Sequence, residues 1–312
     1  MNPRKQRNPG PAGGYHLLLF FHRVLPRCVF NACVAVGSWV AMLKMGPQRR
    51  ASRDYLRLVL NREPTWLDVA RHFNTFARTL HFRLLVGSTK DPKLCLPHWH
   101  GEEFMNLVRS GTQILYGSFH IGCSDLLGYT LSDGFCPVYM IRLKVGNSHD
   151  TERFARIYKG VTILWMNDPQ SVLFGINKAI GEGASITMLC DRPEFSSKNE
   201  DFVFLGRKQK FPVTIYHLSA MYRLPVAFCF AIYNGERVET FAPKPFMPEG
   251  GKREILKAGH EHFQQVLRDV ETLLAEHPYH WFNFDAAPLP EDMQAQAPAM
   301  AEPAREAAAP NV

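Results

Sequence analysis

The chain has 312 residues, of which 46% are hydrophobic, so it can bury a sizeable core as one large domain or two smaller ones. Its net charge of +7 suits an anionic partner, such as lipid headgroups, an acidic carrier protein or nucleic acid, although a basic soluble enzyme could carry the same charge. The basic residues are scattered and accompany no recognised nucleic-acid-binding motif, which argues against nucleic-acid binding. The seven cysteines are odd in number, widely spaced and free of CxxC pairs, which indicates reduced, buried thiols in a cytosolic environment.

Residues 1–45 divide into two parts. Residues 1–14 are rich in Pro, Gly and Arg and are predicted to be disordered. Residues 15–45 are largely apolar, and their least interrupted part, 28–45, is about the minimum length that spans a bilayer core. No convincing small-residue cleavage site is present, so a cleaved signal peptide is not expected. We predict that 15–45 is a membrane-associating segment, interfacial or shallowly inserted; a buried amphipathic helix pair is the alternative.

Residues 46–285 are predicted to form an α/β domain. Apolar residues at helical spacing predict helices over 50–61 and 65–86. From Thr112 onward, short apolar runs rich in β-branched and aromatic residues alternate with helical stretches, which predicts a largely parallel central sheet flanked by helices. The predicted strands are 113–118, 137–143, 161–166, 185–190 and 226–233, with 237–246 as an added antiparallel edge strand. The predicted helices between them are 123–132, 149–159, 171–182 and 214–223.

The C-terminal part of the chain is predicted to contain one helix and a tail. Residues 253–277 carry apolar side chains at helical period and are predicted to form a long amphipathic helix that Pro278 ends. Residues 286–312 are mostly Ala, Pro and Glu and are predicted to be a disordered tail.

The segment 117–125, which reads Gly-Ser-Phe-His-Ile-Gly-Cys-Ser-Asp, carries the strongest candidate for chemistry. In a regular helix the side chains of His120 and Asp125 would diverge by roughly 140°, so they can meet only if His120 lies in a strand-to-helix turn. Glycines at 117 and 122 supply the backbone freedom for that turn. Asp125 would then accept a hydrogen bond from one imidazole nitrogen, and the other nitrogen could take a proton from a hydroxyl.

The predicted helix start would add free amide N–H groups near Gly122 and Cys123, which could stabilise an oxyanion. The activated hydroxyl oxygen could then attack an acyl thioester directly. No Gly-x-Ser-x-Gly elbow surrounds Cys123 or Ser124, which disfavours either as a nucleophile. The non-functional alternative is a helix-capping Asp125 beside a core histidine, and the spacing alone does not separate the two.

Further short motifs follow this pair in a definite order. They are Phe154-Ala155-Arg156, Leu189-Cys190-Asp191, Phe204-Leu205-Gly206, Phe211-Pro212 and Pro225-Val226. Together with the His-x4-Asp spacing, this order resembles the lysophospholipid acyltransferase superfamily, and within it the bacterial late acyltransferases of lipid A biosynthesis. The resemblance covers about residues 15–285.

The resemblance implies a membrane-associated transferase on the cytoplasmic face of a bacterial inner membrane. Such an enzyme moves a fatty acyl chain from acyl carrier protein or coenzyme A to a lipid hydroxyl, and it uses no metal or redox cofactor. Two departures bear on the acceptor. Asp191-Arg192 stands where the lipid A enzymes usually have Asp-Gln, and residues 281–285 end in an acid where those enzymes have basic residues that suit a phosphorylated sugar. The acceptor is therefore left open between a lipid A-like lipid and another glycolipid or aminolipid.

Four residues are candidates for substrate binding. Arg156 and Arg192 could pair with a phosphate or hold the catalytic acid in place, the alternative being surface salt bridges. Asp191 ends a predicted strand, where α/β sheets tend to place functional groups, although an Asp there can also form a turn. Gly122 would contribute its backbone amide.

Other patterns carry weaker signals. The basic run 207–210 could meet lipid phosphates or an acidic carrier, or it could be a solvated loop. The Phe-rich stretch 73–82 could line an acyl groove or be ordinary core. The pairs His98/His100 and His260/His262 lack a third ligand at a recognisable spacing, so no metal site is predicted.

Two other functions stay open at this point. A thioesterase or esterase could use the same His120–Asp125 pair to activate water. A non-catalytic lipid-binding protein could share the fold.

Overall fold

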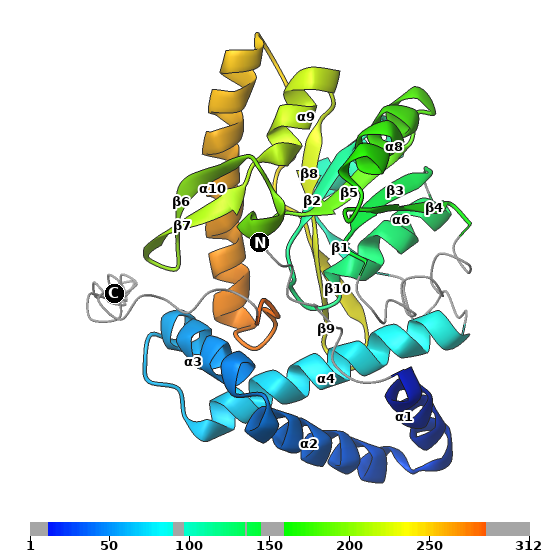
Figure 1. Ribbon diagram of the computed structural model, residues 1–312, viewed down its shortest axis with the longest axis vertical. Helices are drawn as coiled ribbons and strands as arrows, with labels where there is room; N and C mark the ends of the chain where they lie inside the picture. The colour runs from blue at the N-terminus through cyan, green and yellow to red at the C-terminus, as the bar shows by residue number, and fades with distance from the viewer. Residues whose placement is uncertain (1–11, 90–96, 135, 145–158, 285–312) are drawn as a thin grey trace, which may run out of the picture.

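The computed structural model describes residues 12–89, 97–134, 136–144 and 159–284. At its centre is a five-stranded, all-parallel sheet of order β4-β3-β5-β2-β8 (Figure 1). The strands are β2 (Leu115–Ser118), β3 (Val138–Arg142), β4 (Val161–Trp165), β5 (Ser185–Leu189) and β8 (Val226–Phe228). Each lies inside a predicted strand, and the predicted α/β class with a largely parallel sheet flanked by helices is confirmed.

Helices pack against both faces of this sheet. One core contains side chains of α8 (Pro169–Gly181), α9 (Thr214–Tyr222) and α10 (Lys252–Glu276). The other contains side chains of α4 (Trp66–Thr89), α5 (Glu102–Arg109) and α6 (Leu127–Gly134). Because successive side chains of a strand point to opposite faces, Leu115 of β2 joins the first core and Tyr116 joins the second.

Some of the predicted helices are confirmed, and others differ from the structure. Those over 171–182, 214–223 and 253–277 are present as α8, α9 and α10. The helix predicted from residue 123 begins instead as a 3-10 turn, Ser124–Leu126, which α6 continues. The predicted helix 149–159 lies outside the described residues, apart from residue 159.

A second, smaller sheet has the order β1-β10-β9. The predicted strand 226–233 divides at Cys229, so that β9 (Phe230–Tyr233) leaves the central sheet and joins the second one. There β10 (Val238–Phe241) pairs antiparallel with β9, as predicted. However, β1 (Pro97–His100) pairs with the other side of β10, which is therefore a central strand and not an edge.

The basic run 207–210 lies in a β-hairpin and not in a loop. Antiparallel strands β6 (Asn199–Phe204) and β7 (Arg207–Pro212) are joined by Leu205 and Gly206, both with positive φ, as a tight two-residue hairpin requires. The amide N–H of Leu205 donates to the Glu271 carboxylate of α10, which anchors the unusual turn residue.

The N-terminal part contains α1 (Ala12–Val24), α2 (Arg27–Lys44) and α3 (Gly46–Leu60). Residues 12–14 belong to α1, which corrects their predicted disorder, whereas residues 1–11 and the predicted disordered tail, 286–312, lie outside the described residues. Within the described part of the chain, α2 is the helix long and apolar enough to cross a membrane by length and composition. Membrane association itself stays a prediction.

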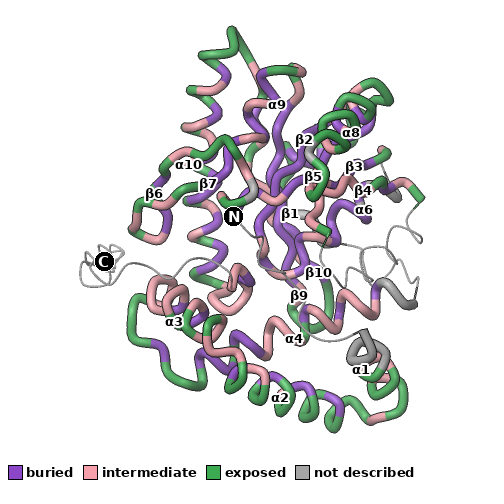
Figure 2. Tube along the Cα trace, viewed as in Figure 1, coloured by how far each residue is buried: buried purple, intermediate pink, exposed green. Residues whose placement is uncertain are grey.

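Both faces of α2 carry apolar side chains. Phe30, Val34 and Met42 are buried against the protein, whereas the opposite face is exposed (Figure 2). The exposed large apolar side chains of α2 are Val29, Val36, Trp39, Val40 and Leu43. This helix therefore offers an apolar surface that the described residues leave uncovered.

Burial also tests two weaker predictions. Cys123, Cys190 and Cys229 are buried, as predicted, but Cys28 and Cys33 of α2 are exposed. In the Phe-rich stretch, Phe73 and Phe82 lie in the core.

Packing of α10 on α9 supplies a test of the fold. A Cβ at buried Gly259 would lie 2.6 Å from Cδ1 of Tyr216, which sits against core residues and cannot move aside freely. We therefore expect Gly259→Ala to lower the free energy of unfolding by about 1–3 kcal/mol in urea titrations. A Cβ at Gly181 of α8 would meet nothing within 4 Å, so Gly181→Ala should be neutral or slightly stabilising. Equal stabilities for the two variants would contradict the packing described.

Candidate active site

His120 and Asp191 meet where two neighbouring parallel strands end. Strands β2 and β5 pair with Ser118 opposite Leu189, so each of the two residues stands two positions past its strand. The Nδ1 of His120 lies 2.8 Å from Oδ1 and 3.0 Å from Oδ2 of Asp191. The backbone N–H of His120 also donates to Oδ2 of Asp191 at 2.9 Å. Ring and backbone of His120 are thus fixed by one carboxylate.

The environment of this pair sets its protonation. The Asp191 side chain is fully buried, while that of His120 is 26% exposed. Burial alone raises the pKa of Asp191, but the nearby His120 ring, its two hydrogen bonds and the charge of Arg192 outweigh burial, so the pKa lies below its usual value. A carboxylate only accepts hydrogen bonds, so neutral His120 carries its proton on Nδ1 and leaves a lone pair on Nε2.

The Nε2 of His120 is the atom left for chemistry. Within the described part of the chain it has no hydrogen-bond partner, and the ring is partly open to solvent. An imidazole held in one tautomer by a buried carboxylate, with its other nitrogen accessible, can act as a general base.

The predicted bond between His120 and Asp125 is corrected by this geometry. Asp125 lies in the 3-10 turn, where its carboxylate pairs with Arg83 of α4 and, at 3.5 Å, with Arg142 at the end of β3. Arg142 also donates to the Asp125 carbonyl oxygen at 3.1 Å. Two arginines therefore occupy the carboxylate that the spacing assigned to the imidazole, and the sheet register supplies Asp191 in its place.

The predicted oxyanion site at Gly122 is also corrected. The Gly122 N–H donates to the His280 carbonyl oxygen at 2.8 Å, and the Cys123 N–H donates to the Ala231 carbonyl oxygen at 2.8 Å. Both amides are therefore already paired. Gly122 has a φ of 51°, and a Cβ there would lie 2.3 Å from the Ala231 oxygen, so this position needs glycine for the close approach of β9.

Other predicted residues are placed as follows. Arg192 is half-buried next to Asp191 and contributes to the low pKa of its carboxyl. Arg156 lies outside the described residues. His260 bonds to Glu200 at 2.5 Å and His262 to Tyr216 at 2.6 Å, so the two rings have separate partners. Among the described residues, no three His, Cys, Asp or Glu side chains are grouped as metal ligands would be.

Residues 278–284, which we name the C-terminal clasp, pack against the His120 turn. The sequence pattern linked 281–285 to the acceptor only and did not predict this contact. Trp281 of the clasp forms an antiparallel bridge with Ile121. The Phe282 N–H donates to the His120 carbonyl oxygen at 2.7 Å, and the Asn283 amide donates to the Asp191 carbonyl oxygen at 3.1 Å. The clasp thus contacts the backbone of both site residues.

Helices α3 and α4 hold the clasp in turn. The Nε2 of buried His72 lies 2.8 Å from the Trp281 carbonyl oxygen, and its Nδ1 lies 2.8 Å from the Ser52 hydroxyl. The carbonyl can only accept, so neutral His72 carries its proton on Nε2 and accepts from Ser52. Tyr55 donates to the Pro278 carbonyl oxygen at 2.8 Å.

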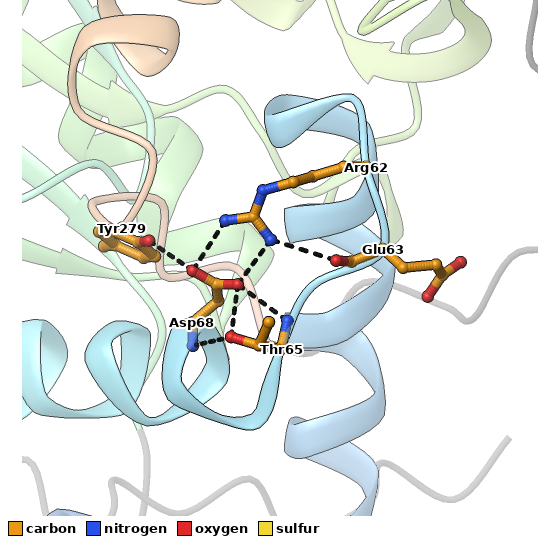
Figure 3. Close-up of polar contacts among 5 residues, drawn as sticks. All are labelled: Arg62, Glu63, Thr65, Asp68 and Tyr279. Carbon is orange, nitrogen blue, oxygen red and sulfur yellow. Dashed lines mark hydrogen bonds and ion pairs between the residues drawn. The ribbon is translucent and has the colours of Figure 1, made fainter.

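The N-terminus of α4 adds a further contact to the clasp through Asp68 (Figure 3). Thr65 and Asp68 cap the helix reciprocally, each backbone N–H bonding to the other side chain at 2.8 and 3.2 Å. Arg62 bonds to both carboxylate oxygens, and the Tyr279 hydroxyl donates to Oδ1 at 2.8 Å. The hydrogen bond from Arg62, followed by those from Thr65 and Tyr279, holds the pKa of Asp68 far below its usual value despite burial.

No protein-family model matches this chain, and no curated protein sequence matches it.

Acidification should loosen the clasp through His72. Burial lowers the pKa of His72 to about 4, below the value of about 6.5 expected in the unfolded chain. The stability from neutral His72 is therefore complete above about pH 6.5 and is lost as the pH falls towards 4, by roughly 3 kcal/mol in total. We expect His72→Gln to show a smaller decline in unfolding free energy over that range, measured by urea titration at each pH. His217→Gln is the control: burial lowers the pKa of His217 as well, but this ring is only half-buried and lies away from the clasp, so the variant should keep more of the wild-type decline than His72→Gln.

Nitrogen NMR can distinguish Asp191 from Asp125 as the partner of His120. In protein labelled with ¹⁵N-histidine, the neutral His120 ring should show its proton on Nδ1, and His120→Gln identifies the signals. Asp191→Ala should give a mixture of tautomers because the acceptor at Nδ1 is gone. Asp125→Asn should leave the tautomer unchanged. A tautomer that responds to Asp125→Asn and not to Asp191→Ala would overturn the pairing.

Proposed function

We propose that this chain is a membrane-associated O-acyltransferase that moves a fatty acyl chain from an acyl thioester to a hydroxyl of a lipid acceptor. The single observation that carries the proposal is the His120–Asp191 pair, whose accessible Nε2 is available as a base. The ordered motifs around it, which resemble those of the lysophospholipid acyltransferases, supply the reaction class.

The chemistry needs one proton shuttle. Nε2 of His120 takes the proton of the acceptor hydroxyl as its oxygen attacks the thioester carbonyl carbon. The carbon–oxygen bond forms and the carbon–sulfur bond breaks, and the imidazolium returns the proton to the leaving thiolate. Buried Asp191 stabilises the imidazolium between these two transfers and keeps the ring in place.

In this proposal Arg156, which matches an arginine of the resembled family, and Arg192, which departs from it, bind substrate. No oxyanion role is assigned to the Gly122 amide because it is already bonded. Asp191 takes the role of the orienting acid that the five-residue spacing had assigned to Asp125. The donor is acyl carrier protein or coenzyme A, both of which carry negative charge that suits a chain of net charge +7.

The proposed location is the cytoplasmic face of a bacterial inner membrane. Its support is the exposed apolar face of α2 together with the exposed Phe20 and Val24 of α1. A surface of this kind is costly in water and fits the boundary between headgroups and acyl chains. The proposed acceptor is a lipid A-like lipid, another glycolipid or an aminolipid.

Two alternatives use the same observations. A thioesterase or esterase would direct Nε2 of His120 at water in place of a lipid hydroxyl. A lipid-binding protein would use the apolar helices alone. The accessible base favours an enzyme over the latter, since binding alone does not need one.

The test is lipid mass spectrometry of a bacterial host with and without the expressed chain. The expected result is a lipid heavier by one acyl chain, and purified protein should transfer a labelled acyl group from acyl carrier protein to the same lipid. His120→Ala should reduce transfer about 10²–10⁴-fold, with Asp191→Asn close behind and Asp125→Asn less affected. Vesicle binding should be unchanged in all three.

Undiminished transfer by His120→Ala would overturn the mechanism. Release of free fatty acid at the same rate with and without lipid would identify a thioesterase. Lipid binding without turnover of any acyl thioester would identify a binding protein.

A further inference from the structure

A small basic cavity lies at the corner where α2 ends and α3 and α4 begin. It has a volume of about 190 Å³ and is lined by Arg49, Arg50 and Arg53 of α3 with Thr65, Trp66 and Val69 around the start of α4. Arg53 stands four residues after Arg49 and three residues after Arg50, so its side chain shares a face of α3 with each of them. Sites that bury a drug-sized ligand measure about 300–1,000 Å³, so this cavity suits a small ionic group and not a whole lipid.

The acids near these arginines form their ion pairs with other side chains, although Arg53 is close enough to Glu63 to contribute to the lowered pKa of that carboxyl. Arg57 pairs with Asp54 at 3.7 Å and with Glu63 at 2.6 Å, and Arg62 pairs with Asp68 at 2.8 Å. Within the described part of the chain, neither Arg50 nor Arg53 forms an ion pair, and both are exposed. The cavity therefore presents two exposed arginines that no described residue holds in an ion pair, with Glu63 as a more distant counter-charge to Arg53.

The third arginine is held in place on the cavity wall. Nη1 of Arg49 donates to the carbonyl oxygens of Met42 and Leu43 at the end of α2, at 3.2 and 3.1 Å. Its guanidinium carbon lies 5.5 Å from the centre of the Trp66 ring, within the range of a cation–π contact. This arginine is thus fixed between the apolar helix and the cavity.

The surroundings are apolar and exposed. Leu43 of α2 is 59% exposed, and Trp66 and Leu67 of α4 are 53% and 61% exposed. A tryptophan with exposed aliphatic neighbours beside unpaired arginines is the composition found at the headgroup level of a bilayer. Arginine forks match the oxygens of a phosphate group in charge and in geometry.

We propose that this cavity binds the phosphate group of an anionic membrane lipid, with Arg50 and Arg53 contacting the phosphate oxygens and Trp66 and Leu67 entering the interface. The inference rests on the membrane association in the proposed function but not on acyl transfer. Val69 of the cavity wall stands one helical turn before His72, which holds the C-terminal clasp. A lipid bound in this cavity would therefore hold the N-terminal part of α4, which contacts the C-terminal clasp, at the depth of the membrane headgroups.

Vesicle cosedimentation tests the site. The full chain should bind phosphatidylcholine vesicles containing phosphatidylglycerol more tightly than phosphatidylcholine alone, and the preference should weaken with salt. Arg50→Gln/Arg53→Gln, which keeps Arg49 and its contacts with α2, should reduce binding to the anionic vesicles about 25-fold, or about fivefold for each arginine. Thermal unfolding of each variant verifies that it is folded.

The matched control is Arg253→Gln/Lys257→Gln. It removes the same charge from exposed positions on the first turns of α10, at the far end of the molecule from α3 (Figure 1). We expect it to keep most of the binding to phosphatidylglycerol vesicles. Equal losses in the two double variants would show a response to net charge alone and would overturn the proposed site.

Soluble glycerol 1-phosphate distinguishes the source of the phosphate. If millimolar glycerol 1-phosphate competes with the vesicles, and this competition is lost in Arg50→Gln/Arg53→Gln, the cavity recognises the phosphate itself. If vesicle binding depends on the two arginines but glycerol 1-phosphate does not compete, the cavity needs the lipid interface. Wild-type protein that binds neither ligand would overturn the proposal. Acyl transfer in detergent micelles is measured separately. If no transfer occurs but the protein still prefers anionic vesicles, the acyltransferase proposal is refuted and the phosphate-site proposal is retained.

Discussion

The parallel pairing of β2 with β5 is the constraint on which the candidate site depends. It brings His120 and Asp191 together although 71 positions separate them, and it aligns both the ring nitrogen and the backbone N–H of His120 with one carboxylate. A fully buried carboxylate is costly unless its oxygens are bonded. His120 supplies those bonds, so the interaction that orients the imidazole ring also offsets the cost of burying the acid.

The N-terminal helices are connected to this pair through the C-terminal clasp. Phe282 bonds to the backbone of His120, while His72, Tyr55 and Asp68 bond to other residues of the clasp. A displacement of α4 relative to the sheet would have to break these bonds or carry the clasp with it. Helices α3 and α4, on which the apolar helix α2 packs, are thus joined to the site by direct hydrogen bonds and not only by the chain between them.

The sequence revealed the fold class and the position of the turn because buried strands of a parallel sheet are short, apolar and β-branched, and His120 directly follows one. It also placed Asp191 at a strand end. It could not reveal that β5 lies beside β2, because strand order is a property of the assembled sheet, and so it gave His120 the wrong carboxylate. The sequence also could not reveal the bond from the Gly122 amide to His280, because this contact forms only when the C-terminal segment packs against the turn. The β6–β7 hairpin was missed because its turn begins with Leu205, which is not a turn-forming residue type.

The correction at His120 gives Asp125 a different physical task. With Asp191 on the imidazole, Asp125 faces Arg83 of α4 and Arg142 of β3, so one carboxylate joins a helix, the turn and the sheet. A largely buried ion pair adds little net stability compared with apolar packing, but removal of one partner is costly because it takes away a buried counter-charge. Loss of Asp125 would therefore remove the carboxylate that Arg83 and Arg142 share close to the His120 turn while leaving the hydrogen bond at Nδ1 in place. The five-residue spacing between the histidine and the aspartate then reflects where the 3-10 turn is held by ion pairs, and the His120 ring is oriented by Asp191 at the end of the neighbouring strand β5.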